Sequence, residues 1–145
     1  MAKPLLRIDY AVLCDEIRKE DSGKLILIGV YSGDVMLKSF PGKVALAAYV
    51  LGEALGQGEA TIELKYSFKP LSGKSKNILL RGRLSVDRLD QTREFTSPIS
   101  RVPIEFTEPG TLSLDYRLDN GRWRNILRKN VIALPAGSIE SSRPS

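Results

Sequence analysis

Hydrophobic and polar residues alternate along most of this chain. The alternation is clearest in residues 6–14, 61–69, 78–87 and 112–119. A period of two predicts β-strands with one buried and one solvated face, which antiparallel sheets provide. In the first of these segments, one buried face is expected to carry Leu6, Ile8, Tyr10, Val12 and Cys14.

Two further segments, residues 25–31 and 44–51, are apolar at nearly every position. This pattern indicates central strands, or strands covered by a second layer. Turn-forming Gly, Pro, Asn and Asp residues separate the segments. The sequence therefore predicts an all-β protein: an antiparallel β-sandwich of about seven to nine strands, immunoglobulin-like or a related Greek key. We expect one domain over residues 1–135 and a polar tail over residues 136–145.

Prolines mark one of the expected strands. Pro98, Pro103 and Pro109 surround the apolar residues of segment 102–106. Proline has no N–H to donate to a ladder, so this strand is expected at a sheet edge or with a bulge. A free edge is also a natural place for self-pairing. The expected partner is an unknown protein, or a second copy of the chain through weak self-association at this edge.

The last hairpin has the most specific local signal. Asn120-Gly121 is a preferred pair for a two-residue type I′ turn. That turn would align Leu118 with Trp123 in the core, and Arg117 with Arg124 on the outer face.

Length, charge and cysteine content narrow the class of protein. The chain has 145 residues and a net charge of +5, which permits an anionic partner without requiring one. Cys14 is the single cysteine, so an intrachain disulfide framework is excluded. Neither a secretory signal nor an apolar run of membrane-spanning length is evident. We therefore expect a cytoplasmic protein with no membrane association.

Catalytic signatures are scarce in the sequence. There is no histidine, which removes the commonest general base and most metal sites. The sequence has no phosphate-binding glycine motif between a strand and a helix. Cys14 continues an apolar face and is expected to be buried and unreactive. We expect a protein that is not an enzyme and that holds no cofactor or metal.

The basic C-terminal hairpin is the main candidate site. Its candidate anion-binding residues are Arg117, Arg122, Arg124 and Arg128. Arginine forks bind phosphates and carboxylates, and like charges facing each other on a sheet are unfavourable without a counterion. The simpler explanation is a solvated face with internal ion pairs. Both interpretations stay open at this point.

A motif near the N-terminus resembles a known signature. From residue 14 the chain reads Cys-Asp-Glu-Ile-Arg-Lys-Glu-Asp-Ser-Gly-Lys, and then Leu-Ile-Leu-Ile-Gly-Val-Tyr. It is similar to the signature of an uncharacterised family of small β-rich bacterial or phage proteins, a domain of unknown function. The resemblance implies a small β protein and no particular activity. The residues expected to form a structural signature turn are Asp15, Arg18, Gly23, Lys24, Gly29 and Tyr31.

These observations favour a non-catalytic binding or assembly module of a bacterium or phage. The alternative is an accessory protein that uses the basic hairpin to bind anions, either nucleic acid or a phosphorylated ligand. Nucleic acid is not the favoured partner, because the basic charge is modest.

Overall fold

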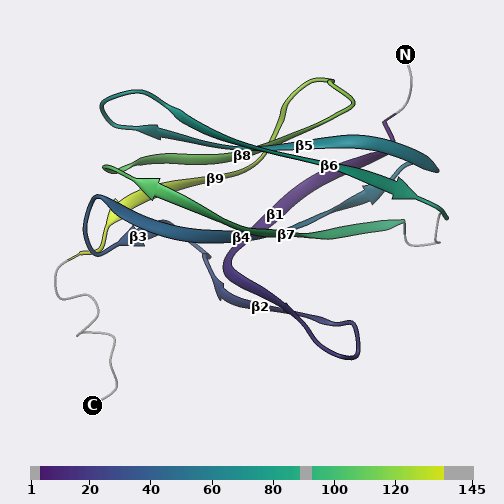
Figure 1. Ribbon diagram of the computed structural model, residues 1–145, viewed down its shortest axis with the longest axis horizontal. Helices are drawn as coiled ribbons and strands as arrows, with labels where there is room; N and C mark the ends of the chain where they lie inside the picture. The colour runs from purple at the N-terminus through teal and green to yellow at the C-terminus, as the bar shows by residue number, and fades with distance from the viewer. Residues whose placement is uncertain (1–3, 89–92, 136–145) are drawn as a thin grey trace.

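The computed structural model describes residues 4–88 and 93–135, which form nine strands and no helix. The strands make two sheets (Figure 1). The four-stranded sheet has the order β2 (Leu25–Val30), β1 (Leu6–Lys19), β4 (Gly42–Ala54), β7 (Glu94–Phe106). The five-stranded sheet has the order β3 (Val35–Leu37), β9 (Arg124–Ala133), β8 (Gly110–Leu118), β5 (Gly58–Pro70), β6 (Lys76–Val86). The predicted all-β class and the strand number are confirmed.

Strand pairing is antiparallel in both sheets except between β3 and β9, which are parallel. The strand order places β4 between β1 and β7, so the apolar segment 44–51 is a central strand, as expected. The immunoglobulin-like or Greek-key topology stays a prediction.

Inward-facing side chains of the two sheets form one hydrophobic core. The core joins residues of β1, β4 and β7 with residues of β5, β8 and β9. Phe68 of β5 and Phe106 of β7 meet edge to face, with ring centroids 4.8 Å apart. The buried Tyr116 hydroxyl accepts a hydrogen bond from the Ile8 backbone N–H at 3.1 Å. This bond joins the two sheets through a polar group that would otherwise be costly to bury.

A bulge in β1 changes the face that its side chains share. The β1–β4 register shifts between Ile8 and Tyr10. Leu6 and Ile8 are buried, but Tyr10 is 53% exposed, so its predicted place on the buried face is wrong. The extra residue of a bulge inverts the alternation that follows it. Cys14 is buried, as predicted, and burial raises the pKa of its thiol.

The proline-marked segment is confirmed as an edge strand. It forms part of β7, the outer strand of the four-stranded sheet. Pro98 aligns with Tyr49 and Pro103 aligns with Ala45, and the β4–β7 register shifts between these pairs. Both predicted features, edge and bulge, are therefore present.

The predicted register of the last hairpin is wrong near its turn. Leu114 aligns with Leu127 as expected, but a bulge follows, and Tyr116 then aligns with Arg124. The positive-φ residues are Asp119 and Asn120. Asp119 is held there because its carboxylate accepts a hydrogen bond from the Thr61 backbone N–H at 2.8 Å. The turn therefore forms one residue earlier than Asn120-Gly121.

Within the described ranges, no helix is long and apolar enough to cross a membrane. The polar tail expected over residues 136–145 lies outside the described residues.

Candidate protein-interaction surface

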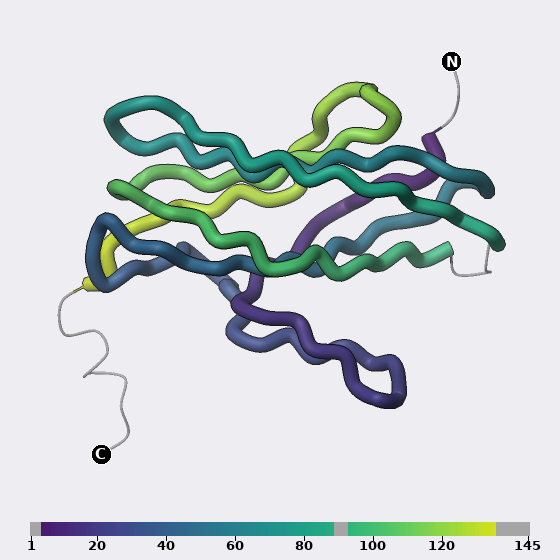
Figure 2. The backbone as a smooth tube through the Cα atoms, viewed as in Figure 1, coloured from purple at the N-terminus to yellow at the C-terminus, as the bar shows by residue number. Residues whose placement is uncertain are grey.

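The second half of β1 and the whole of β2 form a two-stranded arm, residues 15–30. Pairing of β1 with β4 ends at Cys14, while pairing with β2 continues to Lys19. Figure 2 shows this hairpin extending away from the two packed sheets. Among the described strands, β2 pairs with β1 and has a free outer edge.

The arm exposes apolar side chains. Ile26, Ile28 and Val30 share one face of β2 and are 41%, 37% and 50% exposed. Segment 25–31 was predicted to be a central or covered strand, and that prediction is wrong for the isolated chain. A pattern that is apolar on both faces indicates burial, yet β2 lies at an edge with its outer face in solvent.

Local interactions set the shape of the arm. Gly23, with φ of +91°, occupies the turn, and its N–H donates to the Glu20 carbonyl at 2.9 Å. Gly29, with φ of +70°, lies so close to Asp15 that an added Cβ would overlap that carboxylate. The backbone of Gly29 therefore approaches the Asp15 side chain closely. Arg18 pairs with Glu16 at 3.4 Å, its neighbour on the same face of the strand.

Tyr31 anchors the base of the arm. Its hydroxyl donates to Asp15 Oδ1 at 2.7 Å, and its backbone N–H donates to the Leu13 carbonyl at 2.8 Å. Lys129 Nζ donates to the Tyr31 carbonyl at 2.9 Å. Burial, followed by the bond to Asp15, raises the pKa of Tyr31. The signature residues Asp15, Gly23, Gly29 and Tyr31 thus build the arm.

The inner side of the arm faces the four-stranded sheet across a hollow of about 250 Å³. Ile17 and Leu25 line it from the arm, and Ala47 and Ile99 line it from the sheet. On the outer face of this sheet, exposed Tyr10 aligns with half-buried Leu51. The arm contributes three of the exposed large hydrophobic side chains among the described residues, Ile26, Ile28 and Val30.

The predicted anion-binding residues do not form one cluster. Arg117 lies beside β5, not opposite Arg124, and its Nε bonds Glu63 Oε1 at 2.9 Å. Arg81 contacts the other oxygen of Glu63 at 3.2 Å. Among the described residues, Glu63 is the one buried charged side chain. Arg117 is therefore already paired with a carboxylate of the same chain. The sequence pattern does not reveal this pair, because Glu63 alternates with core residues along β5.

Trp123 belongs to this cluster and not to the core, so its predicted placement is wrong. Lys65 Nζ lies 4.2 Å from the ring centroid, and Arg117 Cζ lies 4.5 Å from it. The half-buried ring covers the outward-facing side chains of β5 and β8 through cation–π contacts. A regular hairpin would align Trp123 with Leu118 and so place the ring in the core. The bulge shifts the register of β9, and Trp123 is no longer aligned with Leu118.

The other three arginines of the hairpin, Arg122, Arg124 and Arg128, are exposed. Arg124 aligns with the buried Tyr116, whereas Arg128 aligns with Ser113 on the outer face. Because of the bulge, Arg124 and Arg128 occupy positions on opposite faces of the sheet. The four arginines therefore do not converge on one surface that could bind an extended anionic ligand.

The Glu63 cluster gives a prediction about pH. The Arg117 hydrogen bond, assisted by Arg81, holds the pKa of the Glu63 carboxyl below its usual value of 4.5, against the opposing effect of desolvation. A lowered folded-state pKa stabilises the protein above the unfolded value, and this stability is lost as pH falls through the folded value. We expect Glu63→Gln to lower the Tm at pH 7, with the difference shrinking as the pH falls below 4.5.

Thermal unfolding of the wild type and of Glu63→Gln across this pH range measures the difference in Tm. Glu59→Gln is the matched control, because Glu59 pairs with Arg83 at 2.8 Å but both side chains are exposed. Such a surface pair contributes about 0–1 kcal/mol. An equal, pH-independent loss in both variants would contradict the role assigned to Glu63.

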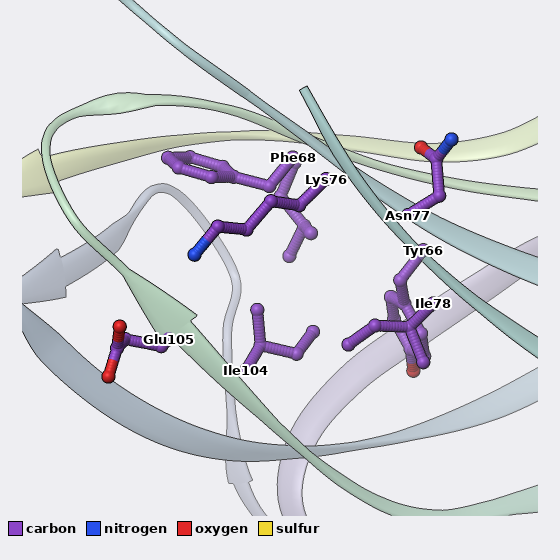
Figure 3. A pocket seen from close by; sticks show the side chains of 8 residues that line it. Tyr66, Phe68, Lys76, Asn77, Ile78, Ile104 and Glu105 are labelled. Atoms are coloured by element: carbon purple, nitrogen blue, oxygen red, sulfur yellow. The ribbon is translucent and has the colours of Figure 1, made fainter. Parts of the chain in front are cut away.

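A cleft opens between the edge strands β6 and β7 (Figure 3). Its volume is about 330 Å³, and Phe68, Ile78 and Ile104 line its apolar part. Lys76 and Glu105 stand on strands at opposite sides of the opening. Within the described residues, this lining lacks a nucleophile paired with a base, so the cleft carries no catalytic assignment.

No protein-family model and no curated protein matches this sequence. The resemblance of the Cys14 to Tyr31 motif to an uncharacterised family therefore stays a prediction.

Proposed function

We propose that this protein is a non-catalytic assembly module whose β1–β2 arm docks on another protein chain. The supporting observation is β2 itself, an apolar strand whose outward side chains are 37–50% exposed on a two-stranded hairpin. An isolated hairpin is marginally stable in water, and exposed apolar patches usually mark interaction sites. Docking would bury Ile26, Ile28 and Val30 and complete the sheet.

Site-specific photo-crosslinking in cells that naturally express the protein tests this proposal. A photoreactive phenylalanine analogue at Ile26 is expected to form a discrete covalent adduct with a protein chain. The matched control is Leu79, an apolar residue of β6 on the other sheet that is 52% exposed. Adducts at neither position, or equally at both, would contradict a docking role for the arm.

The anion-binding alternative has weaker support. Its central residue, Arg117, is bonded to Glu63, and the remaining arginines do not converge. The proposed non-catalytic role and the bacterial or phage origin rest on the sequence analysis.

A further inference from the structure

The four sheet edges differ in their protection against pairing. β7 carries Pro98 and Pro103, and β3 has three residues. β6 carries Arg81 and Arg83. Prolines, charges and short length are the usual ways of blocking edge-to-edge association. β2, with the sequence Leu-Ile-Leu-Ile-Gly-Val, has none of them over its six residues.

We propose that the chain docked on the arm is a second copy of this protein, with β2 pairing antiparallel to β2 of that copy about a two-fold axis. This inference rests on the proposed docking role of the arm. The two four-stranded sheets would then join into one sheet of eight strands. Two-fold pairing requires a self-complementary surface, and β2 meets this requirement in one register.

The proposed register places Leu27 opposite Leu27 of the second copy. Ile26 then faces Ile28 of the second copy, so isoleucines adjoin on the exposed face. On the other face, Leu25 lies opposite Gly29 of the second copy. The Asp15 side chain already lies over Gly29 on this face, so the isoleucine pairs of the other face supply the cross-strand apolar contacts that stabilise antiparallel sheets.

Charges on β1 favour the same register. Arg18 aligns with Ile26, and Glu16 aligns with Ile28. In the proposed register, the row that begins at Arg18 ends at Glu16 of the second copy. A register with Ile26 opposite Ile26 of the second copy would place Arg18 at both ends of one row. A register with Ile28 opposite Ile28 would place Glu16 at both ends. The row ends lie about 14 Å apart, three strand spacings, which exceeds the Debye length of about 8 Å at physiological salt. Charge therefore adds only a small bias to the register, and apolar contact supplies the affinity.

Sedimentation velocity over a wide concentration range tests the dimer. We expect the wild-type chain to show a concentration-dependent monomer–dimer equilibrium, typical of a small interface. Ile28→Lys is expected to raise the dimer Kd about 100-fold or more, because the lost apolar contact occurs twice and each 1.4 kcal/mol is tenfold. Leu79→Lys, at an apolar position of similar exposure, should leave the Kd unchanged. Both variants should keep the wild-type Tm when all three proteins are measured below the wild-type dimer Kd, where oligomerisation does not shift the Tm.

Cysteine substitutions test the register in a Cys14→Ala background. Leu27→Cys should form a disulfide-linked dimer under mild oxidation, because the residue meets its own copy across the axis. Ile26→Cys and Ile28→Cys should each stay uncrosslinked alone and crosslink when mixed. Efficient crosslinking of Ile26→Cys alone would overturn the register.

Two results would overturn the proposed dimer. One is a monomer at every concentration, and the other is a dimer that survives Ile28→Lys. The chain could instead be monomeric while photo-crosslinking at Ile26 gives an adduct whose mass differs from that of two copies of this chain. In that case a different protein docks on the arm, and the proposed docking function stands. If the chain is monomeric and Ile26 gives no adduct, both proposals fail.

Discussion

Replacing Phe106 with alanine is expected to lower the free energy of unfolding by about 3–5 kcal/mol. Phe106 is fully buried at the end of β7, where its ring meets Phe68 of the opposite sheet. Removing the ring loses its transfer free energy and leaves a cavity between two sheets that cannot collapse independently. For a chain of this length the loss corresponds to a fall in Tm of roughly 10 °C.

Urea denaturation at pH 7 measures this loss. Phe95→Ala is the matched control on the same strand, since Phe95 is half-buried at the periphery of the core. We expect it to cost less than half as much, because the remaining space is open to solvent. Equal losses in the two variants would mean that the sheet-to-sheet contact at Phe106 is not the main packing site of β7.

Local patterns predicted the positions of the strands well. They predicted less well which face of a strand each side chain occupies. Alternation located β5, β8 and β6, and the prolines of β7 placed it at an edge. The predicted and observed faces differ beyond each bulge. One inserted residue after Ile8 exposes Tyr10, and another, Ile126 of β9, parts Arg117 from Arg124. A bulge costs little and leaves no compositional mark, so alternation alone does not reveal it.

The candidate site was partly visible in the sequence. Segment 25–31 was correctly identified as apolar on both faces, which predicts cover on both. Whether that cover comes from the same chain depends on long-range pairing, which local pattern does not contain. The structure provides one neighbour, β1, and leaves the other edge of β2 free within the described residues.

The basic hairpin illustrates the opposite error. Four arginines close in sequence suggested one anion-attracting surface, but Arg117 is bound to Glu63 of a strand that is distant in sequence. Alternation over residues 61–69 places Glu63 on the face opposite the core, yet Glu63 is buried. It pairs there with Arg117 and Arg81 of neighbouring strands, a tertiary arrangement that no short segment specifies.

Replacing Gly52 with alanine is expected to destabilise the protein by about 3 kcal/mol, near the upper end for overpacking. Gly52 aligns with Ile8, next to the bulge in β1. An added Cβ would overlap the Arg7 carbonyl oxygen and lie 2.8 Å from the Ile8 Cα. These are backbone atoms held in the β1–β4 ladder, so no side-chain rotation relieves the overlap.

Gly56→Ala separates this clash from the general effect of replacing a glycine. An added Cβ at Gly56 would have no described atom within 4 Å beyond its chain neighbours. That variant should change the free energy of unfolding by at most about 1 kcal/mol, toward greater stability. Thermal and urea unfolding of the two variants give the comparison. If Gly52→Ala matches Gly56→Ala, β1 is not closely packed against β4 beside the bulge. If it is strongly destabilised, as we expect, the N-terminal half of β1 is the rigid base from which the arm extends, because one continuous strand carries both.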